Sequence, residues 1–432
     1  MGKIFQTKLS GFRRRKMPKR ILFFPLDDRP PNYQHVARLA KMAKQSITFV
    51  RKLMKAGNFA TGIISLDGLV YGGLVPSRRM EMAKHTALER LQQIRTWRRD
   101  HSNAHVYVFG TILRSFPRKG SWMRREVRER NHAILLQAIR MVLEGVIHTL
   151  LIGVEDADPK GLAVPERRAI EKMIFSLGLQ KRVFLVDGAD ELGQMLFARF
   201  VLENYAQTVE FIPHFSDPQL RTRIARYESI PILSNVRAHA ALFSAFPQRK
   251  LHVHRVPLFV HIHPGRMRDL HLETVREECP TAKKDNRWIR HQRKPVAIAD
   301  VAYANGACPD FALRLCEQIY PKRYICFTAW NTAGNTVGGT MAWAAIACAS
   351  KIEEKLHVQY LTERILDDFL YQSLLRRTLT GPHERKMLRR QLREEWRVLF
   401  PRQKKFALRD LRVSFPWHRL FEIELEAILD SA

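Results

Sequence analysis

The chain has 432 residues, of which 46% are hydrophobic and 27% are charged, and its formal net charge is +31. These proportions are ordinary for a soluble globular protein, and the length suffices for one large α/β domain or two smaller ones. No window approaches 18 uninterrupted apolar residues, so no membrane span is expected.

The cysteines and the N-terminus indicate the cellular compartment that the sequence favours. Five cysteines form an odd set with no CxxC pair, so a disulfide framework or a structural zinc cluster is not expected and a reducing cytoplasm fits best. Residues 1–19 are basic and lack an apolar core, which predicts a disordered extension rather than a secretory signal.

The positive charge raises the question of an anionic partner. The basic residues are scattered over expected helices, and no zinc-finger, RNP or KH signature accompanies them. A solvated basic surface is therefore favoured over a specific nucleic-acid interface, although it would attract anionic surfaces without specificity.

From residue 20 the chain alternates apolar runs with helical patterns. The expected strands are 21–26, 61–66, 105–112, 146–154, 183–186, 209–213, 251–263, 295–299 and 324–329. The expected helices are 34–54, 81–99, 122–144, 165–177, 191–205 and 340–351, with a mixed segment at 230–246 and an irregular charged segment at 273–294. From 353 onward helices are expected, apart from a short extended piece near Val413.

This alternation predicts a parallel sheet with helical cover. Eight or nine strands favour a (β/α)8-barrel-like sheet with a C-terminal helical extension, and a doubly wound open α/β sheet is the alternative. The expected organisation is an α/β catalytic-type domain at 20–351 and a helical region at 352–432 packed on it. In both folds a site forms where the strands end.

The segment L-L-I-G-V-E-D-A-D-P-K-G, residues 150–161, is typical of a buried strand that delivers acids to a loop. Strand alternation places Glu155 and Asp156 on opposite faces, although the turn can bring both inward. Close carboxylates raise each other's proton affinity, which suits acid–base hydrolysis, in particular of glycosides. The alternative is a turn rich in Asp because Asp caps helices; Asp158 belongs to the same turn.

Two earlier strand ends carry similar groups. In P-L-D-D-R-P-P, the residues Asp27, Asp28 and Arg29 can bind a metal, orient a hydroxylated ligand or form a local ion pair. In S-L-D-G-L-V-Y-G-G, Asp67 precedes two glycines and Arg78 follows, and such glycines serve turns as well as ligands.

Later strand ends add amides and an aromatic ring. Asparagines with a tryptophan fit a sugar, which has hydroxyls on its rim and C–H groups on its faces; helix-capping residues beside a buried tryptophan are the alternative. The His-x-His pair His261 and His263 shows no third metal ligand at short spacing, so no metal and no cofactor are expected. The further candidates for substrate binding are Arg114, Asp190, Asp300, Asn305, Trp330, Asn331 and Asn335.

Together, P-L-D-D-R-P-P-N, S-L-D-G-L-V-Y-G-G-L-V-P-S-R, G-V-E-D-A-D-P-K-G, G-A-D-E-L-G, D-V-A-Y-A-N-G and A-W-N-T-A-G-N-T-V-G resemble a bacterial family known as domain of unknown function 4127. The resemblance runs from about residue 20 to the C-terminal segment and implies no activity, because the family name records none.

The leading hypothesis is a cytoplasmic hydrolase of glycosidase type that acts on a small-molecule or saccharide ligand. Glu155 and Asp156 are its expected acid–base pair, and the other strand-end residues are expected to bind the substrate. The alternatives are a metal-dependent enzyme of another class, or a non-enzymatic ligand-binding protein with a basic surface.

Overall fold

The computed structural model describes residues 20–53, 57–115, 125–246, 251–275, 278–318, 324–400 and 405–431. The N-terminal extension expected at 1–19 lies outside the described residues. Ten described strands form two all-parallel sheets. Sheet A contains β1 (Ile21–Phe24), β2 (Ile47–Phe49), β3 (Thr61–Ser65), β4 (His105–Ile112), β5 (Thr149–Val154) and β6 (Val183–Asp187), and sheet B contains β7 (Gln207–Phe215), β8 (His252–His261), β9 (Val296–Asp300) and β10 (Tyr324–Thr328).

The strand order confirms an α/β fold with parallel sheets. Sheet A runs β2-β1-β3-β4-β5-β6, and sheet B runs β10-β9-β8-β7. The pairing of the described strands does not confirm the expected barrel, because β6 and β7 are edge strands of different sheets. Helices α6 (Leu192–Asn204) and α10 (Ala333–Ala349) pack on each other and on both sheets, so they occupy the space that a closed barrel would fill with strand side chains. Two open sheets are compatible with the alternative expectation, a doubly wound open α/β sheet.

The central strands β1, β3, β5 and β9 are buried along their whole length, because both of their faces are covered. In β1, Ile21 and Phe23 enter a core shared with α6, α10 and sheet B, whereas Leu22 and Phe24 enter a second core beneath the outer helices. Successive side chains therefore fill opposite cores, as the two-residue period of a strand requires.

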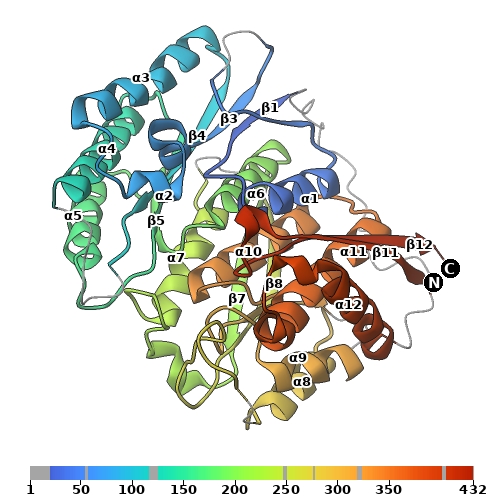
Figure 1. The fold of residues 1–432 in the computed structure, drawn as a ribbon. Helices are drawn as coiled ribbons and strands as arrows, with labels where there is room; N and C mark the ends of the chain where they lie inside the picture. The colour runs from blue at the N-terminus through green and yellow to red at the C-terminus, as the bar shows by residue number, and fades with distance from the viewer. Residues whose placement is uncertain are drawn as a thin grey trace.

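The helices form layers around these sheets (Figure 1). The outer core of sheet A is closed by α3 (Lys84–Asp100), α4 (Arg125–Leu143) and α5 (Ala163–Ser176), drawn in blue to teal. On the inner side, α1 (Gln34–Met42) and α6 lie in the middle of the molecule, and α7 (Ile232–Ser244) packs on β6 and β7. Residues of α8 (Ala282–His291) and α9 (Pro309–Gln318) pack against β8 on the opposite flank.

The last eighty residues depart from the expected helical region. They contain α11 (Glu354–Arg364), a π-helical turn (Ile365–Leu375) and α12 (Arg385–Leu399), but also an antiparallel hairpin of β11 (Phe406–Ser414) and β12 (Glu424–Ser431). Buried and more exposed residues alternate along much of the hairpin, and such a period of two in the sequence indicates strands rather than helices. No described helix is long and apolar enough to cross a lipid bilayer.

Candidate active site

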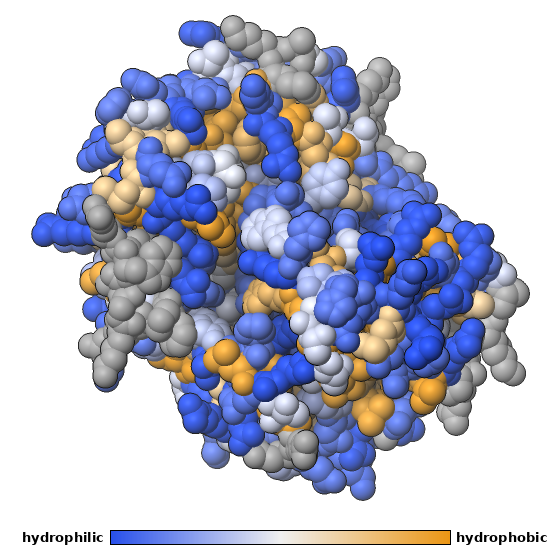
Figure 2. All heavy atoms as spheres, in the orientation of Figure 1, coloured by the Kyte–Doolittle hydropathy of each residue, from blue (hydrophilic) through white to orange (hydrophobic). Residues whose placement is uncertain are grey.

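The carboxyl ends of five strands of sheet A and of β10 deliver polar side chains to one region. Because all strands of a parallel sheet point the same way, the loops that follow them meet at one edge. The face drawn in Figure 2 is hollowed near its centre, between the outer helices of sheet A and the C-terminal segment.

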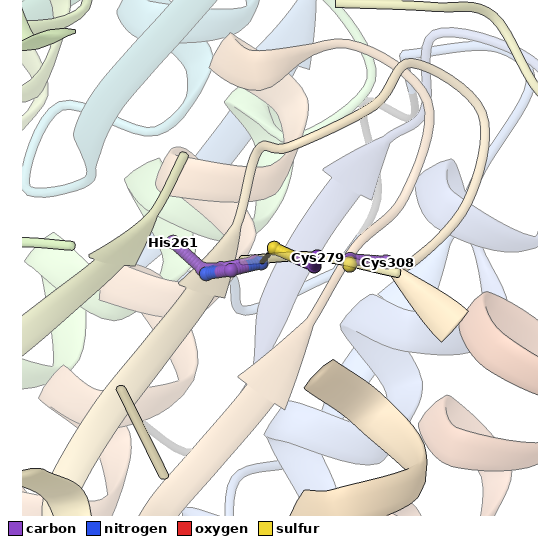
Figure 3. A group of neighbouring side chains, drawn as sticks. All are labelled: His261, Cys279 and Cys308. Carbon is purple, nitrogen blue, oxygen red and sulfur yellow. Dashed lines mark hydrogen bonds between the residues drawn. The ribbon is translucent and has the colours of Figure 1, made fainter. Parts of the chain in front are cut away.

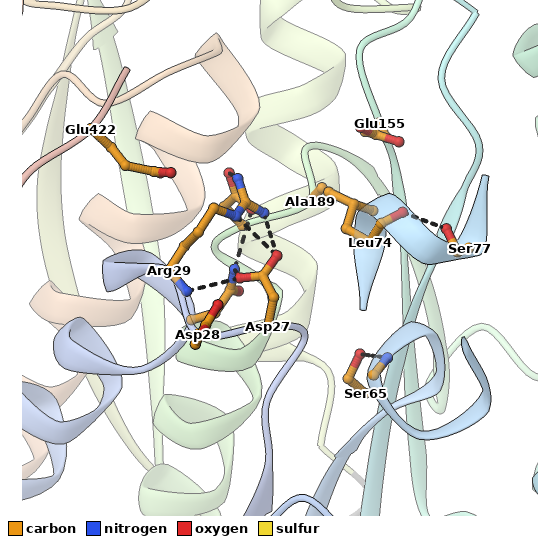
Figure 4. Close-up of polar contacts among 12 residues, drawn as sticks. Asp27, Asp28, Arg29, Ser65, Leu74, Ser77, Glu155, Ala189 and Glu422 are labelled. Carbon is orange, nitrogen blue, oxygen red and sulfur yellow. Dashed lines mark hydrogen bonds and ion pairs between the residues drawn. The ribbon is translucent and has the colours of Figure 1, made fainter. Parts of the chain in front are cut away.

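Arg29, just after β1, is the centre of this region (Figure 4). Its Nη1 and Nη2 donate to the two carboxylate oxygens of Asp190 at 3.2 and 2.6 Å, and its Nε donates to Asp27 Oδ2 at 2.9 Å. Arg29 is only 6% exposed. Burial opposes its charge, but Asp190 and Asp27 outweigh that effect and raise the pKa of the guanidinium.

Asp190 is held from several sides. Asn331, after β10, donates to its Oδ2 at 3.2 Å, and Asn32 donates to Asp27 at 2.9 Å and to Asp190 at 3.4 Å. The Asn335 side-chain oxygen accepts the backbone N–H groups of residues 189 and 190 at 3.0 and 3.1 Å. These contacts fix both the carboxylate and the loop that carries it.

A close approach of backbones makes this arrangement possible. A Cβ at Gly334, in the first turn of α10, would lie 1.9 Å from the carbonyl oxygen of Asp187 at the end of β6. Only glycine lets the start of α10 reach the end of β6. Asn335 can therefore contact the loop that carries Asp190.

Glu155 and Asp156 follow the last residue of β5 and pair with different arginines. Glu155 is buried and pairs with Arg78, whose Nε donates to Oε2 at 3.2 Å. The Asp156 side chain is 26% exposed and pairs with Arg114, with Nη2 and Oδ2 3.0 Å apart. Each acid of the expected pair therefore faces its own guanidinium.

The charged groups that act on Asp156 include its own partner Arg114, the partner of Glu155, and the Asp190 carboxylate that Arg29 binds. Burial raises the pKa of Asp156 against the opposing charges of Arg114 and Arg78, and the negative charge of Asp190 raises it further. Burial also lowers the pKa of Arg78 to about 10, with the charge of Arg114 acting in the same direction. Asp156 is also held at φ 29°, a left-handed conformation that non-glycine residues seldom adopt.

The other expected site residues lie at different places. Asp67 is buried, accepts the N–H of Thr111 at 3.0 Å and has a pKa that burial raises to about 7. Asp158 accepts the N–H of Lys160 at 2.8 Å, which is the turn role that was the alternative for this segment. The Asn305 side chain donates to Asp269 at 2.8 Å, and its N–H donates to the carbonyl of Asn331.

The loop between β11 and β12 adds residues that the sequence did not indicate. The Trp417 indole N–H donates to half-exposed Asp28 at 2.8 Å, and the ring lies 5.6 Å from the Arg29 guanidinium. Glu422 points toward Arg29 from the other side (Figure 4), and its pKa is raised by burial against the charge of Arg29. These two residues lie nearly 400 positions from Asp28, so local pattern had no means of linking them.

Three buried polar atoms around the region lack a hydrogen-bond partner within the described ranges. They are the Oδ1 of Asn32, the Nε1 of Trp330 and the Oε2 of Glu422. Trp330 is buried edge-on against Phe421 of the hairpin loop. Because buried polar groups in proteins are nearly always satisfied, unpaired atoms of this kind are unusual.

Asp300 belongs to a second cluster at the end of β9. Its carboxylate accepts the N–H of Ala302 at 3.1 Å and of Cys308 at 2.7 Å, and burial raises its pKa to about 6 against the charge of His261. Among the described residues, the atoms of His261, Cys279 and Cys308 are the group suited to hold a metal ion.

The fold and the region therefore define an α/β protein with a buried carboxylate–guanidinium cluster at its strand ends. The chain belongs to the family described as "Protein of unknown function (DUF4127)", which it matches over residues 21–121 and 115–426. The family resemblance of the sequence motifs is thereby confirmed. No curated protein matches the chain in sequence.

Proposed function

We propose that the strand-end cluster is the active site of a hydrolase that cleaves glycosidic bonds, with Asp156 as general acid–base. The observation that carries this proposal is the state of Asp156: a partly exposed carboxyl with a raised pKa, beside ionised partners, on a backbone of positive φ. Perturbed carboxyl groups and strained backbone gather at functional sites.

The anionic partner of Asp156 in this proposal is Asp190 rather than Glu155. Asp190 accepts hydrogen bonds from Arg29 and from the side chains of two asparagines, Asn32 and Asn331. Burial raises the pKa of Asp156, so in this proposal Asp156 carries the proton and Asp190 acts as the carboxylate.

The proposed reaction assigns a different step to Asp156 and to Asp190. Protonated Asp156 donates its proton to the glycosidic oxygen as the bond to the anomeric carbon breaks. The Asp190 carboxylate stabilises the positive charge that develops on the sugar. Water supplies the hydroxyl group to the anomeric carbon, and its remaining proton returns to Asp156.

The surrounding residues suit the binding of a hydroxylated substrate. The half-exposed carboxylate of Asp28 offers an acceptor for a hydroxyl group. Trp417 is 41% exposed and offers an aromatic face to a sugar ring. Glu155 has a positioning role here, because it holds Arg78 beside Asp156.

The test is hydrolysis of a panel of aryl glycosides by the purified protein and by Asp156→Asn. Removal of a general acid–base costs about 10²- to 10⁴-fold in rate, so kcat is expected to fall by that amount. Glu210→Gln is the matched control, because Glu210 lies on β7 and forms an exposed ion pair with Arg255 of β8. Absence of turnover by the wild type, or full activity of Asp156→Asn, would contradict the proposal.

A further inference from the structure

A second group of reactive side chains lies on sheet B, away from the residues proposed for catalysis. His261 ends β8, Cys279 precedes α8, and Cys308 immediately precedes α9. The three residues are buried, and one ligand atom from each lies within 4.8 Å of the others. Figure 3 shows the imidazole ring and both sulfur atoms directed toward one another.

The distance between two of the ligand atoms fits one edge of a small tetrahedron. His261 Nε2 and Cys279 Sγ are 3.7 Å apart. In a tetrahedral zinc site with bonds of about 2.0 Å to nitrogen and 2.3 Å to sulfur, the nitrogen–sulfur edge is roughly 3.6 Å. An ion therefore fits beside these two atoms with little movement of either.

The other ring nitrogen of His261 has the partner that metal-bound histidines use. Its Nδ1 lies 2.9 Å from Oδ2 of Asp285, which is itself buried. When a metal ion is bound, a carboxylate at this position keeps the proton on Nδ1 so that Nε2 coordinates the ion. This contact is independent of the cysteine geometry and points to the same use of the ring.

The second sulfur lies on a loop that a hydrogen bond holds in place. The backbone N–H of Cys308 donates to Asp300, which fixes the loop that carries the second sulfur.

We propose that His261, Cys279 and Cys308 bind one zinc ion, with water in the fourth position and Asp285 as the residue that orients His261. Thiolate and imidazole ligands select zinc over magnesium or calcium, which prefer oxygen ligands. The ion would join the end of β8 to the loops that precede α8 and α9. The expectation of no metal followed from spacing, because 18 residues separate the first two ligands.

The first test is the metal content of the full chain, purified without a metal-affinity tag and measured by inductively coupled plasma mass spectrometry. About one zinc per chain is expected for the wild type. Cys279→Ser and Cys308→Ser are each expected to lose at least tenfold of that content. Cys316→Ser is the matched control, since Cys316 is a buried cysteine on α9 outside the group, and it should retain the ion.

A second measurement does not depend on variants that replace a ligand. Cobalt(II) added to metal-free wild-type protein should produce thiolate-to-cobalt charge-transfer absorption that saturates at one equivalent and is reversed by zinc. Asp285→Asn should weaken zinc affinity about 10- to 100-fold in competition with a chelator, because it removes only the orienting carboxylate. Absence of cobalt absorption, equal zinc loss in Cys316→Ser, or a Cys279–Cys308 disulfide in the freshly purified protein would overturn the proposal.

Discussion

The carboxylate of Asp190 meets Arg29 through two hydrogen bonds in a region from which most solvent is excluded. A buried ion pair adds little stability relative to apolar packing, but the loss of one partner leaves a desolvated charge. Removing one partner of this buried pair should therefore lower the free energy of unfolding more than removing one partner of an exposed pair.

This asymmetry gives a prediction for Asp190→Asn. The substitution should lower the free energy of unfolding by about 3 kcal/mol, because Arg29 loses the carboxylate that accepts from both of its terminal nitrogens. Glu210→Gln, which breaks the exposed pair with Arg255, should change it by at most about 1 kcal/mol. Urea unfolding measures both values, and equal effects would contradict the distinction.

Asp67 gives a prediction of pH dependence. Burial raises its pKa from 3.8 to about 7, against hydrogen bonds from Thr111 and the charge of Arg78. Below about pH 4 both the folded and unfolded states are protonated. As the pH rises from about 4 to 7 the unfolded state ionises first, so the folded state loses stability.

The free energy of unfolding of the wild type should therefore fall relative to that of Asp67→Asn over this pH range. The shift sets an upper bound of about 4 kcal/mol on the change. Urea unfolding of both proteins at pH 4.5, 6 and 7.5 measures it. Parallel pH profiles would show that Asp67 is ionised in the fold at low pH.

At the scale of elements, α10 is the helix that links the two sheets to the proposed site. Gly334 lies against the backbone at the end of β6, whereas a Cβ at Gly339 on the same helix meets nothing closer than Gln194 Oε1 at 3.9 Å. The two glycines provide a matched pair for testing this contact.

Gly334→Ala should destabilise the protein by about 1–3 kcal/mol, because a methyl group at this position forces helix and strand apart. It should also reduce activity, since Asn335 would move from the loop of Asp190. Gly339→Ala should be neutral or stabilise by up to about 1 kcal/mol through helix propensity. Thermal unfolding distinguishes the two, and a neutral Gly334→Ala would contradict the close approach.

At the scale of the whole molecule, two apolar cores lie on either side of sheet A, and the larger one continues through α6 and α10 into sheet B. The C-terminal hairpin closes over the strand ends through Trp417 and Glu422. Part of the net positive charge gathers on the outer face of α12, where Lys386, Arg390 and Arg397 line a shallow surface. The domain boundaries expected at 19 and 351 stay predictions.

The sequence by itself determined the parallel α/β class and the family. It also placed Asp27, Arg29, Asp156, Asp190 and Asn331 at strand ends. These features are local, because in a parallel sheet an apolar run followed by a polar turn indicates a buried strand and the loop at its carboxyl end. The sequence misplaced the edge strand β2 within an expected helix, and the charged segment 273–294 contains α8. At β2 tertiary packing outweighed the local pattern, whereas α8 buries Ala282, Asp285 and Ile289 on one face, so its helical period is present in the sequence.

Only the tertiary structure decided which residues meet. It paired Glu155 with Arg78 and Asp156 with Arg114, and it moved Asp300 into the cluster of His261, Cys279 and Cys308. It also placed Glu422 near Arg29. These contacts join segments that are far apart in the chain, and their partners depend on how α10 and the C-terminal hairpin pack between and over the sheets. No periodicity in the sequence contains that information, because periodicity fixes only the face of an element.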